Sequence, residues 1–378
     1  MEKSTSRVTA SIPRAELEAW LILSRLPGVG DQKIAVLVQK FGHPEDVLRA
    51  SPNSLSDLLG IPLRQLKTAL ESVRNPLLNK QCQILSNGDF RMYTLWDDDY
   101  PSMLRNIHTP PVMIFTRGKI CEEDRRSVAI VGARSATEYG KRIAYDLGYG
   151  LGNMGLTVVS GLARGIDSFA HKGALDGGGR TIGVLGCGPD LAYPPENRSL
   201  MESIVDSGAV LSEFPPGTTP NPRHFPRRNR VIAGLSLGVV VVQASMKSGA
   251  LITASRALEQ GKEVMAVPGP VNARVSRGPH SLIKQGAALV EEPDDVLAAL
   301  GEPLVTHHPV KKIELPKLTK EEQELLSVMG SDPVHIDTLC SKTGQPSGIL
   351  LARLLELELK GVVKQLAGKQ FLSLVDDA

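Results

Sequence analysis

The stretch Val128-Ala129-Ile130-Val131-Gly132-Ala133-Arg134 places a glycine and an arginine directly after a short apolar run. A run of this length, rich in β-branched residues, is typical of a buried strand. The glycine lets the backbone turn tightly and come close to a ligand. The same order returns at Thr157–Ser160, which is followed by Gly161-Leu162-Ala163-Arg164. The repeated pattern predicts two strands of one sheet with similar turns at their ends.

Further apolar runs alternate with amphipathic segments between residues 81 and 300. The predicted strands are Met92–Leu95, Val112–Phe115, Val128–Val131, Thr157–Ser160, Thr181–Leu185, Ala209–Leu211, Val239–Val242 and Glu263–Val267. The predicted helices lie near Tyr139–Met154, Ile166–Gly173, Glu196–Ser207, Arg230–Gly234 and Ala250–Glu259. Nearly continuous apolar strands that alternate with helices indicate a mostly parallel sheet covered on both faces. The predicted class is therefore α/β, with a doubly wound, Rossmann-like core.

Helical patterns flank this core on both sides. Residues 12–80 are predicted to form a helical domain of the helix-hairpin-helix (SAM-like) type, because Leu26-Pro27-Gly28-Val29-Gly30 separates two amphipathic runs. A degenerate copy of this turn follows at Leu58–Pro62. Residues 301–317 contain three prolines and no periodicity, so they are predicted to be a linker. Residues 318–378 open with a capping box and continue with three helices and a hairpin, which is the order of a winged helix.

The composition excludes several classes of protein. With 42% hydrophobic and 22% charged residues in 378, the chain is neither disordered nor fibrous, and its longest apolar run is too short to cross a membrane. The polar N-terminus lacks the apolar segment of a signal peptide, and the four cysteines are widely spaced, so a cytoplasmic protein is expected. The net charge of +2 counts against a strongly basic nucleic-acid binder, but it says nothing about how the charges are distributed.

The turns after the strands carry the candidate binding residues. Ligands of open α/β sheets bind beyond the carboxyl ends of the strands. The candidates there are Gly132, Arg134, Gly161, Arg164, Lys247, Ser248 and Gly249, all in small-residue turns that lead into helices. Because helix N-termini and backbone N–H groups attract anions, several such turns at one sheet edge predict an extended phosphate-binding track. Each turn by itself is equally compatible with tight packing.

The largest local concentration of charge is Arg223-His224-Phe225-Pro226-Arg227-Arg228-Asn229-Arg230, which holds four arginines and no acid. Since this block precedes the strand at Val239, it is expected near the other turns. Arginine forks suit phosphate oxygens, and an aromatic ring such as Phe225 can stack on a nucleic-acid base. The alternative for this block is an ordinary solvated charged surface.

Familiar cofactor motifs are absent or misplaced. The chain contains no GxxxxGK[ST] loop and no HExxH, and the GxGxxG match at Gly150–Gly155 precedes a strand instead of following one. No cofactor and no metal site are therefore expected. Asp167 and His171 lie four residues apart on one predicted helix and resemble an acid/base pair, although a structural hydrogen bond is the alternative.

Several of these segments together resemble the DNA-processing protein A (DprA, or Smf) family. They are Val131-Gly132-Ala133-Arg134, Ser160–Asp167, Phe225–Leu235 and Lys247–Ala254, in the family's order and spacing. The resemblance covers the whole middle segment and, more weakly, both flanks. It implies a bacterial, non-enzymatic protein that binds single-stranded DNA, protects incoming strands during natural transformation, loads RecA recombinase on them and forms homodimers through the Rossmann-like domain.

The resemblance also implies roles for particular residues. Arg134 matches the family's phosphate contact, and Arg227, Arg228, Asn229 and Arg230 together with Lys247, Ser248 and Gly249 match its basic DNA-binding lip. Ala133 departs from the family's usual hydroxyl residue, and Pro279-His280 from its usual polar residue and asparagine. The predicted recognition helix of the winged helix carries only Arg353 and Lys360 as bases, so a structural or protein-binding role is as plausible there as duplex binding.

An enzyme is the principal alternative. The Rossmann-like segment is similar to nucleotide-binding phosphoribohydrolases, whose PGGxGTxxE loop supplies a catalytic glutamate. When Thr253 is aligned with the threonine of that loop, Ile252 stands at the preceding glycine and Arg256 at the glutamate. The predicted absence of the carboxylate leaves no assigned catalytic residue. An oxidoreductase is disfavoured by the failed glycine fingerprint.

Overall fold

The computed structural model describes residues 12–73, 75–302, 318–329, 333–360, 362–366 and 368–373. The chain forms two compact units, Met1–Thr306 and His307–Ala378. The predicted linker lies almost entirely outside the described residues, as do Gly361 and the C-terminal residues 374–378.

The first unit is built on one nine-stranded sheet, which confirms the predicted α/β class. Its strands are β1 (Arg91–Thr94), β2 (Met113–Gly118), β3 (Ser127–Val131), β4 (Thr157–Ser160), β5 (Thr181–Leu185), β6 (Ala209–Ser212), β7 (Gly238–Val241), β8 (Glu263–Ala266) and β9 (Ala288–Leu289). Their order across the sheet is β1-β2-β6-β5-β4-β3-β7-β8-β9. The seven strands from β6 to β9 in this order are parallel, and β1 and β2 add an antiparallel edge.

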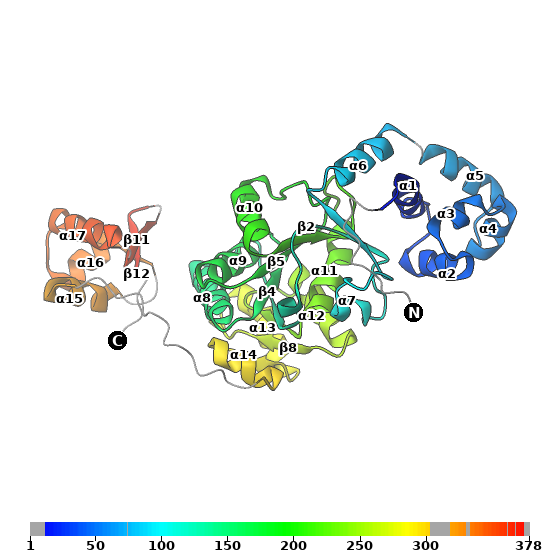
Figure 1. The fold of residues 1–378 in the computed structure, drawn as a ribbon. Coiled ribbons are helices and arrows are strands. Elements are labelled where there is room, and N and C mark those ends of the chain that lie inside the picture. Colours follow the sequence, from blue (N-terminus) through cyan, green and yellow to red (C-terminus); the bar gives the residue numbers. More distant parts are fainter. Residues whose placement is uncertain are drawn as a thin grey trace. The chain divides into compact units, whose positions relative to one another are not determined.

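Helices cover both faces of the sheet, so its parallel strands are apolar on both sides (Figure 1). The helices of this part are α7 (Ser102–Arg105), α8 (Glu138–Asn153), α9 (Ile166–Asp176), α10 (Arg198–Ser207), α11 (His224–Leu235), α12 (Gly249–Glu259), α13 (Arg277–Lys284) and α14 (Pro293–Leu300), with short 3₁₀ turns η2 (Glu122–Arg125), η3 (Pro195–Asn197) and η4 (Arg274–Ser276). Side chains of α8, α9, α10 and α14 pack on one face, and those of α7, α11 and α12 on the other.

The strand order reverses beside β3. After β3 the chain adds β4, β5 and β6 on one side, and it then returns to place β7 and β8 on the other side. In doubly wound sheets the loops diverge at such a switch point and leave a crevice beyond the carboxyl ends of the strands. The crevice is expected between the loops that follow β3 and β7.

Helix α11 differs from its prediction, because it begins at His224 and so includes the arginine block. Pro226 stands in its first turn, where a missing N–H breaks no intrahelical hydrogen bond. Along a helix, residues three apart share a face, whereas adjacent residues point about 100° apart. Arg227 and Arg230 therefore share a face of α11, and Arg228 points away from both of them.

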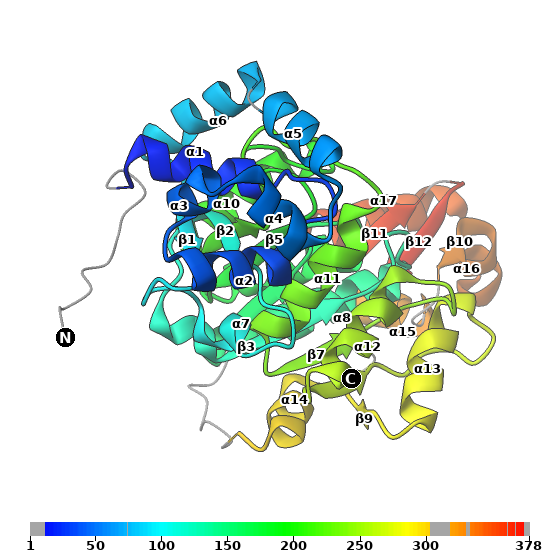
Figure 2. The ribbon, with the colours of Figure 1, turned by 90° about the vertical axis from the view of Figure 1, so that its right-hand side faces the viewer.

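The N-terminal helices pack against the antiparallel edge of the sheet (Figure 2). They are α1 (Arg14–Leu23), α2 (Asp31–Phe41), α3 (Pro44–Arg49), α4 (Pro52–Leu59), α5 (Leu63–Ser72) and α6 (Pro76–Ser86). Both predicted glycine turns are present, with Gly28 and Gly60 at φ values of +74° and +64°, which side chains rarely adopt. The boundary predicted at residue 80 falls inside α6, and the stacked rings of Trp20 and Trp96 join the helices to the sheet's part of the unit.

The second unit has the predicted winged-helix arrangement. It contains α15 (Lys320–Met329), β10 (Val334–His335), α16 (Ile336–Thr343), α17 (Ser347–Leu359), β11 (Val363–Leu366) and β12 (Gln370–Ser373), with the strands in the order β10-β12-β11. Thr319 and Glu322 form the predicted capping box, since each backbone N–H donates to the other side chain, at 2.8 Å and 3.3 Å.

Candidate functional site

A cavity of about 240 Å³ opens at the switch point of the sheet. Its walls come from the loops after β3, β4 and β7, from α11, and from the starts of α9 and α12. The lining residues are Val131, Gly132, Arg134, Ala163, Asp167, Phe225, Pro226, Arg228, Asn229, Ile232, Ser248, Gly249, Ala250, Ile252 and Thr253. Pockets beyond the carboxyl ends of parallel strands are where doubly wound proteins bind their ligands.

The loop after β3 is held by Gln243. The backbone N–H of Ala133 donates to the carbonyl of Gln243 at 2.7 Å, and the Gln243 amide accepts from the N–H of Thr137 and donates to its hydroxyl. A side chain at Gly132 would place its Cβ 2.5 Å from Ile166 on α9, so only glycine allows this close packing. The fixed loop projects the exposed side chain of Arg134 at the rim of the cavity.

The guanidinium of Arg134 lies over the ring of Phe225, with its carbon 5.1 Å from the ring centre. Such a cation–π contact positions the arginine without neutralising it. The same ring is tilted against Tyr193, at 5.8 Å between ring centres, and packs onto Gly186 after β5. Because Phe225 is only partly buried, its ring combines an apolar surface with a neighbouring cation.

The loop after β4 packs on the buried side chain of Arg228. This arginine is 5% exposed and donates to the carbonyl oxygens of Gly161 and Val184, both at 2.6 Å. Any Cβ at Gly161 would overlap its guanidinium. Gly161 therefore makes room for an internal arginine, which differs from the expectation that it brings the backbone close to a phosphate.

Asp167 is the carboxylate that balances Arg228. It is 5% exposed and accepts from the N–H groups of Gly161 and Ala163, at 3.1 Å and 3.4 Å. Burial raises the pKa of Asp167, while Arg228 and the two N–H donors oppose that rise. His171 contacts Thr181 at 2.6 Å, and burial lowers the pKa of His171 to about 3, so it stays neutral. Both side chains therefore have structural partners of their own.

The loop after β7 supplies the second exposed cation. Lys247 is exposed, and no acidic partner is found for it among the described residues. Ser248 caps α12 by accepting from the N–H of Ala250, and Asn229 donates to the carbonyl of Gly249 at 3.2 Å. The N-terminus of α12, with its positive dipole end, therefore faces the cavity.

Two arginines of the block are internal ion-pair partners. Arg227 and Arg230 both contact the carboxylates of Glu213 and Asp31, at distances between 2.7 Å and 3.0 Å. Burial raises the pKa of Glu213, and the two arginines counteract this rise. Asp31 stands in the first turn of α2, so the first glycine turn of the helical region faces α11 and presents an acid there. Two of the four positive charges are thus neutralised within the fold.

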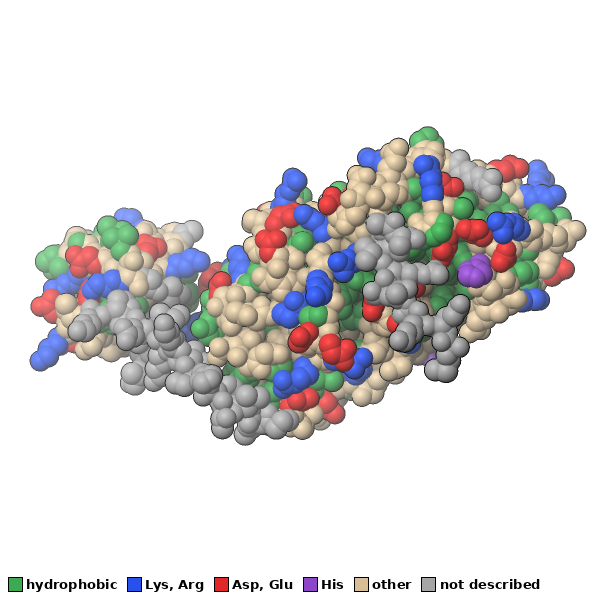
Figure 3. Space-filling model, in the orientation of Figure 1, with side chains coloured by type: hydrophobic (Ala, Val, Ile, Leu, Met, Phe, Trp, Pro, Cys, Tyr) green, Lys and Arg blue, Asp and Glu red, His purple; other side chains and the backbone are tan. Residues whose placement is uncertain are grey.

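Arg164 is also paired, although its side chain is 63% exposed. Its guanidinium contacts Glu196 of η3. An exposed pair of this kind is worth little and is readily exchanged for another anion. Arg164 remains available at the cavity's edge, whereas Arg227 and Arg230 are held between two carboxylates. Figure 3 shows acidic and basic side chains interspersed over the face in view, which agrees with a net charge near zero.

Seven of the twelve predicted site residues line the cavity together. They are Gly132, Arg134, Phe225, Arg228, Asn229, Ser248 and Gly249. Lys247 and Arg164 adjoin it, and Gly161 lies beneath it. Sequence reasoning assigns no site role to Ala163, Ile232 or Ala250, which also line the cavity, because small and apolar residues in helices and turns carry no chemical signature.

The cavity offers few groups that could act as a catalytic acid or base, which counts against the enzyme alternative. Asp167 is the one carboxylate among the lining residues, and it is already bonded to two N–H groups near Arg228. Thr253 and Ile252 line the cavity, but Arg256 points to Glu259 with a 2.5 Å ion pair. Within the described ranges, no group of three or more acidic, histidine or cysteine side chains is arranged to hold a metal ion. No helix among the residues described is both long and apolar enough to span a bilayer.

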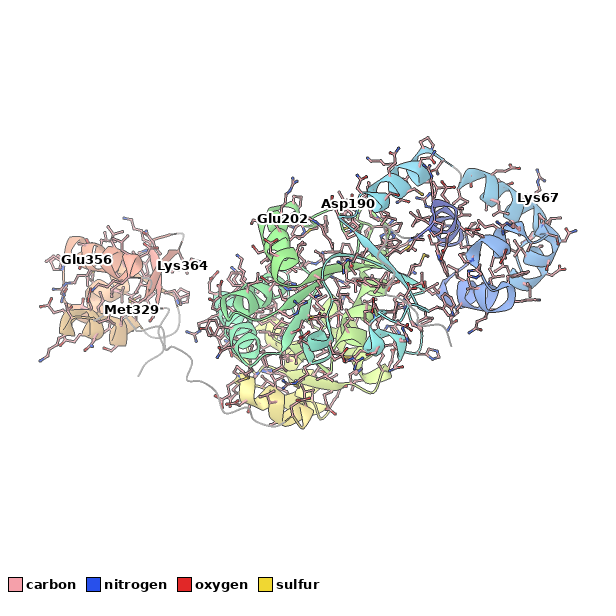
Figure 4. All side chains as sticks on the ribbon, viewed as in Figure 1. Lys67, Asp190, Glu202, Met329, Glu356 and Lys364 are labelled. Atoms are coloured by element: carbon pink, nitrogen blue, oxygen red, sulfur yellow. The ribbon has the colours of Figure 1, made fainter. Side chains whose placement is uncertain are left out.

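The two candidate DNA-binding bases of the winged helix form ion pairs within that domain. Arg353 contacts Glu321 at 2.9 Å, and Lys360 contacts Glu322 at 2.6 Å, so α17 is tied to α15. The lysine lowers the pKa of Glu322. Glu356, labelled in Figure 4, is exposed on α17. Arg353 within α17 and Lys360 at its C-cap are thus both paired with acids, which fits poorly with phosphate contacts by this helix.

Fold and cavity define a doubly wound α/β protein with a cationic, aromatic-lined pocket at its topological switch point. Residues 91–301 match the family model described as DNA recombination-mediator protein A, and residues 311–369 match the DprA winged helix domain. The chain belongs to the DNA-processing protein A (DprA/Smf) family.

Relatives and solved structures agree with this assignment. The chain is 36% identical to protein Smf of Escherichia coli K12 over 93% of its length and 95% of the relative. It is 45% identical to DNA processing protein DprA of Streptococcus pneumoniae R6 over 55% of its length and 74% of that protein. The X-ray structure of S. pneumoniae DprA superposes with a TM-score of 0.66 at 36% identity, covering 76% of this chain and 98% of that one.

A further solved structure is informative about binding. DNA processing protein A of Helicobacter pylori, described for its single-stranded DNA binding mode, superposes with a TM-score of 0.51 at 29% identity. The superposition covers 56% of this chain and 95% of that one. The H. pylori protein thus binds single strands on a fold shared with the larger part of this chain.

Proposed function

We propose that this protein binds single-stranded DNA at the switch-point cavity and its rim. Arg134 and Lys247 contact phosphates, the N-terminus of α12 receives another, and the ring of Phe225 stacks on a base. Phosphates carry no sequence information and every base has a face that can stack, so the binding is sequence-tolerant.

The observation that carries this proposal is the placement of the two exposed cations. Arg134 and Lys247 follow β3 and β7, the strands on either side of the switch point, and neither forms an ion pair with an acid of the described ranges. The arginines that the fold neutralises, Arg227 and Arg230, lie away from the cavity lining. An edge that holds two exposed cations together with an aromatic ring suits a charged polymer with bases.

Family membership supports a proposal about the biological role. We infer that the protein protects incoming single strands and presents them to RecA recombinase during transformation, acting as a homodimer and without catalysis. The commitment of Asp167 to backbone N–H groups and to Arg228 supports the last point, because a general acid or base needs a carboxyl group that can reach a substrate.

Fluorescence anisotropy with a labelled oligothymidylate tests the binding proposal. Affinity is expected to fall steeply between about 50 mM and 200 mM salt through counterion release. Arg134→Ala and Lys247→Ala should each weaken binding and reduce the slope of log K against log salt by about 0.7, the value for one phosphate contact on a single strand. Arg64→Ala and Lys67→Ala, exposed on α5 (Figure 4 labels Lys67), are the matched controls. Salt-independent binding, or equal losses in the controls, would contradict the proposal.

A further inference from the structure

We propose that the DNA track continues past the cavity onto the loop after β8, where Arg274 and Arg277 bind further phosphates of the same strand. This inference rests on the proposed single-strand binding, and it extends the footprint beyond Lys247. Neither arginine belongs to the cavity lining, and both lie about 30 residues from the lysine in sequence.

Backbone hydrogen bonds fix these arginines beside the Lys247 loop. Strands β7 and β8 are parallel neighbours, so their following loops emerge at the same edge. The N–H of Ala244 donates to the carbonyl of Val275 at 2.6 Å, and the N–H of Gly278 donates to the carbonyl of Ala244 at 2.8 Å. Each arginine is therefore adjacent in sequence to a residue bonded to Ala244, which itself lies three residues before Lys247.

Close packing also holds the β8 loop against the β7 loop. A Cβ at Gly278 would lie 2.5 Å from the carbonyl oxygen of Ala244, so the start of α13 sits directly against the β7 loop. The β8 loop is also held at its base, because Tyr139 donates to the carbonyl of Pro268 at 3.0 Å and His280 contacts the carbonyl of Gly269 at 2.9 Å. A loop already fixed in place loses little conformational entropy when it binds a ligand.

The charge of this region is strongly one-sided. From residue 214 to residue 290 the sequence contains only two acids, Glu259 and Glu263, against ten arginines and lysines. Glu259 is paired with Arg256. Arg274 and Arg277 are exposed, and neither has an acidic partner in the part of the chain that is described. They resemble Arg134 and Lys247 in this respect and differ from Arg227 and Arg230.

An exposed apolar side chain accompanies the two cations. Val271 is 86% exposed at the loop between β8 and η4. Apolar side chains beside cations suit a single strand, whose bases are unpaired and offer apolar faces. The continuity of cations from Arg134 to Lys247 and on to the β8 loop favours one extended nucleic-acid strand over a separate partner.

Oligothymidylates of two lengths test the inference with the full chain. The short one is chosen as the shortest that wild type binds with the Lys247-dependent salt slope, and the long one adds several nucleotides. Arg274→Ala/Arg277→Ala should leave the short oligonucleotide's affinity unchanged and weaken the long one several-fold. It should also reduce the salt slope for the long one by about 1.4, that is, by two phosphate contacts. Arg64→Ala/Lys67→Ala removes the same charge elsewhere and should have neither effect.

Three results would overturn the inference while wild type binds DNA: unchanged affinity for the long oligonucleotide, equal losses at both lengths, or equal losses in the control pair. The first is expected if the two arginines serve an acidic protein surface instead. A wild-type chain that binds neither oligonucleotide would contradict the proposed function itself. Unchanged thermal melting of the double variant shows that the readout is not a folding defect.

Discussion

The guanidinium carbon of Arg134 lies 5.1 Å from the centre of the Phe225 ring, so a loop after β3 and the first turn of α11 together form one cation–aromatic surface. If a base stacks on this ring, Phe225→Ala should weaken oligothymidylate binding by about tenfold, within the 1–3 kcal/mol found for stacked bases. Phe225→Trp should retain binding. Equal affinity of the alanine variant and wild type, measured by anisotropy, would remove Phe225 from the interface.

Arg228 is expected to stabilise the fold and not to contact DNA. Replacing it with methionine leaves Asp167 and two carbonyl oxygens without their partner. Loss of one member of a buried charge pair costs about 3–5 kcal/mol. Urea unfolding should show this loss, whereas Arg134→Ala should stay within about 0.5 kcal/mol of wild type because it is an exposed substitution. A stable Arg228→Met protein with impaired binding would point to a direct contact instead.

Gly161→Ala tests the close contact between Gly161 and the buried guanidinium of Arg228. The added methyl group would overlap the Arg228 guanidinium, which two carbonyl groups hold in place. Overpacking of this kind costs about 1–3 kcal/mol. The comparison is Gly249→Ala, where the new Cβ meets no atom within 4 Å and a much smaller change in the urea midpoint is expected. Equal destabilisation of both variants would contradict this account of Gly161.

Asp31 connects the helical region to α11, because its Oδ2 accepts from Arg227 at 2.9 Å and from Arg230 at 3.0 Å. Asp31→Asn should destabilise the first unit by about 1–3 kcal/mol, the range for hydrogen bonds to charged groups. Hydrogen exchange should speed up in α2 and in the first turns of α11. Asp57→Asn, an exposed acid on α4, serves as the control. Exchange rates unchanged at both segments would show that this contact contributes little.

The winged helix should lose stability in acid through Glu322. Lys360 lowers the pKa of this glutamate below its ordinary value in the folded state, so the folded form holds its proton less tightly than the unfolded form. The stabilisation is complete above the unfolded-state pKa of about 4.3 and is lost as the pH falls through the lower, folded-state value. Glu322→Gln should therefore weaken hydrogen-exchange protection of α15 at neutral pH and flatten its dependence on acid. Identical acid profiles for variant and wild type would contradict this linkage.

The fold was largely predictable because local patterns specify it. Apolar runs such as Val128–Val131 and the glycine turns after them identify parallel strands from neighbouring residues alone. The start of α11 differs from the prediction: the pattern places this helix near Arg230–Gly234, whereas it begins at His224 with Pro226 in its first turn, where a proline breaks no intrahelical hydrogen bond.

The candidate site was less predictable than the fold. The turns and the arginine block are visible in the sequence, and the family motifs bring them together. The acidic partners of the arginine block cannot be identified from the sequence. Asp31 is almost 200 residues away from Arg230, and only the fold brings them into contact. A run of like charges therefore predicts the location of a site better than it predicts which charges are free.

Ultraviolet crosslinking of the full chain to an oligothymidylate, followed by mass spectrometry of the linked peptides, tests the central claim most directly. The account predicts crosslinks in the peptide that contains Phe225, and their loss in Phe225→Ala. Crosslinks confined to residues 318–373 of the winged helix, or to the N-terminal helices, would contradict it.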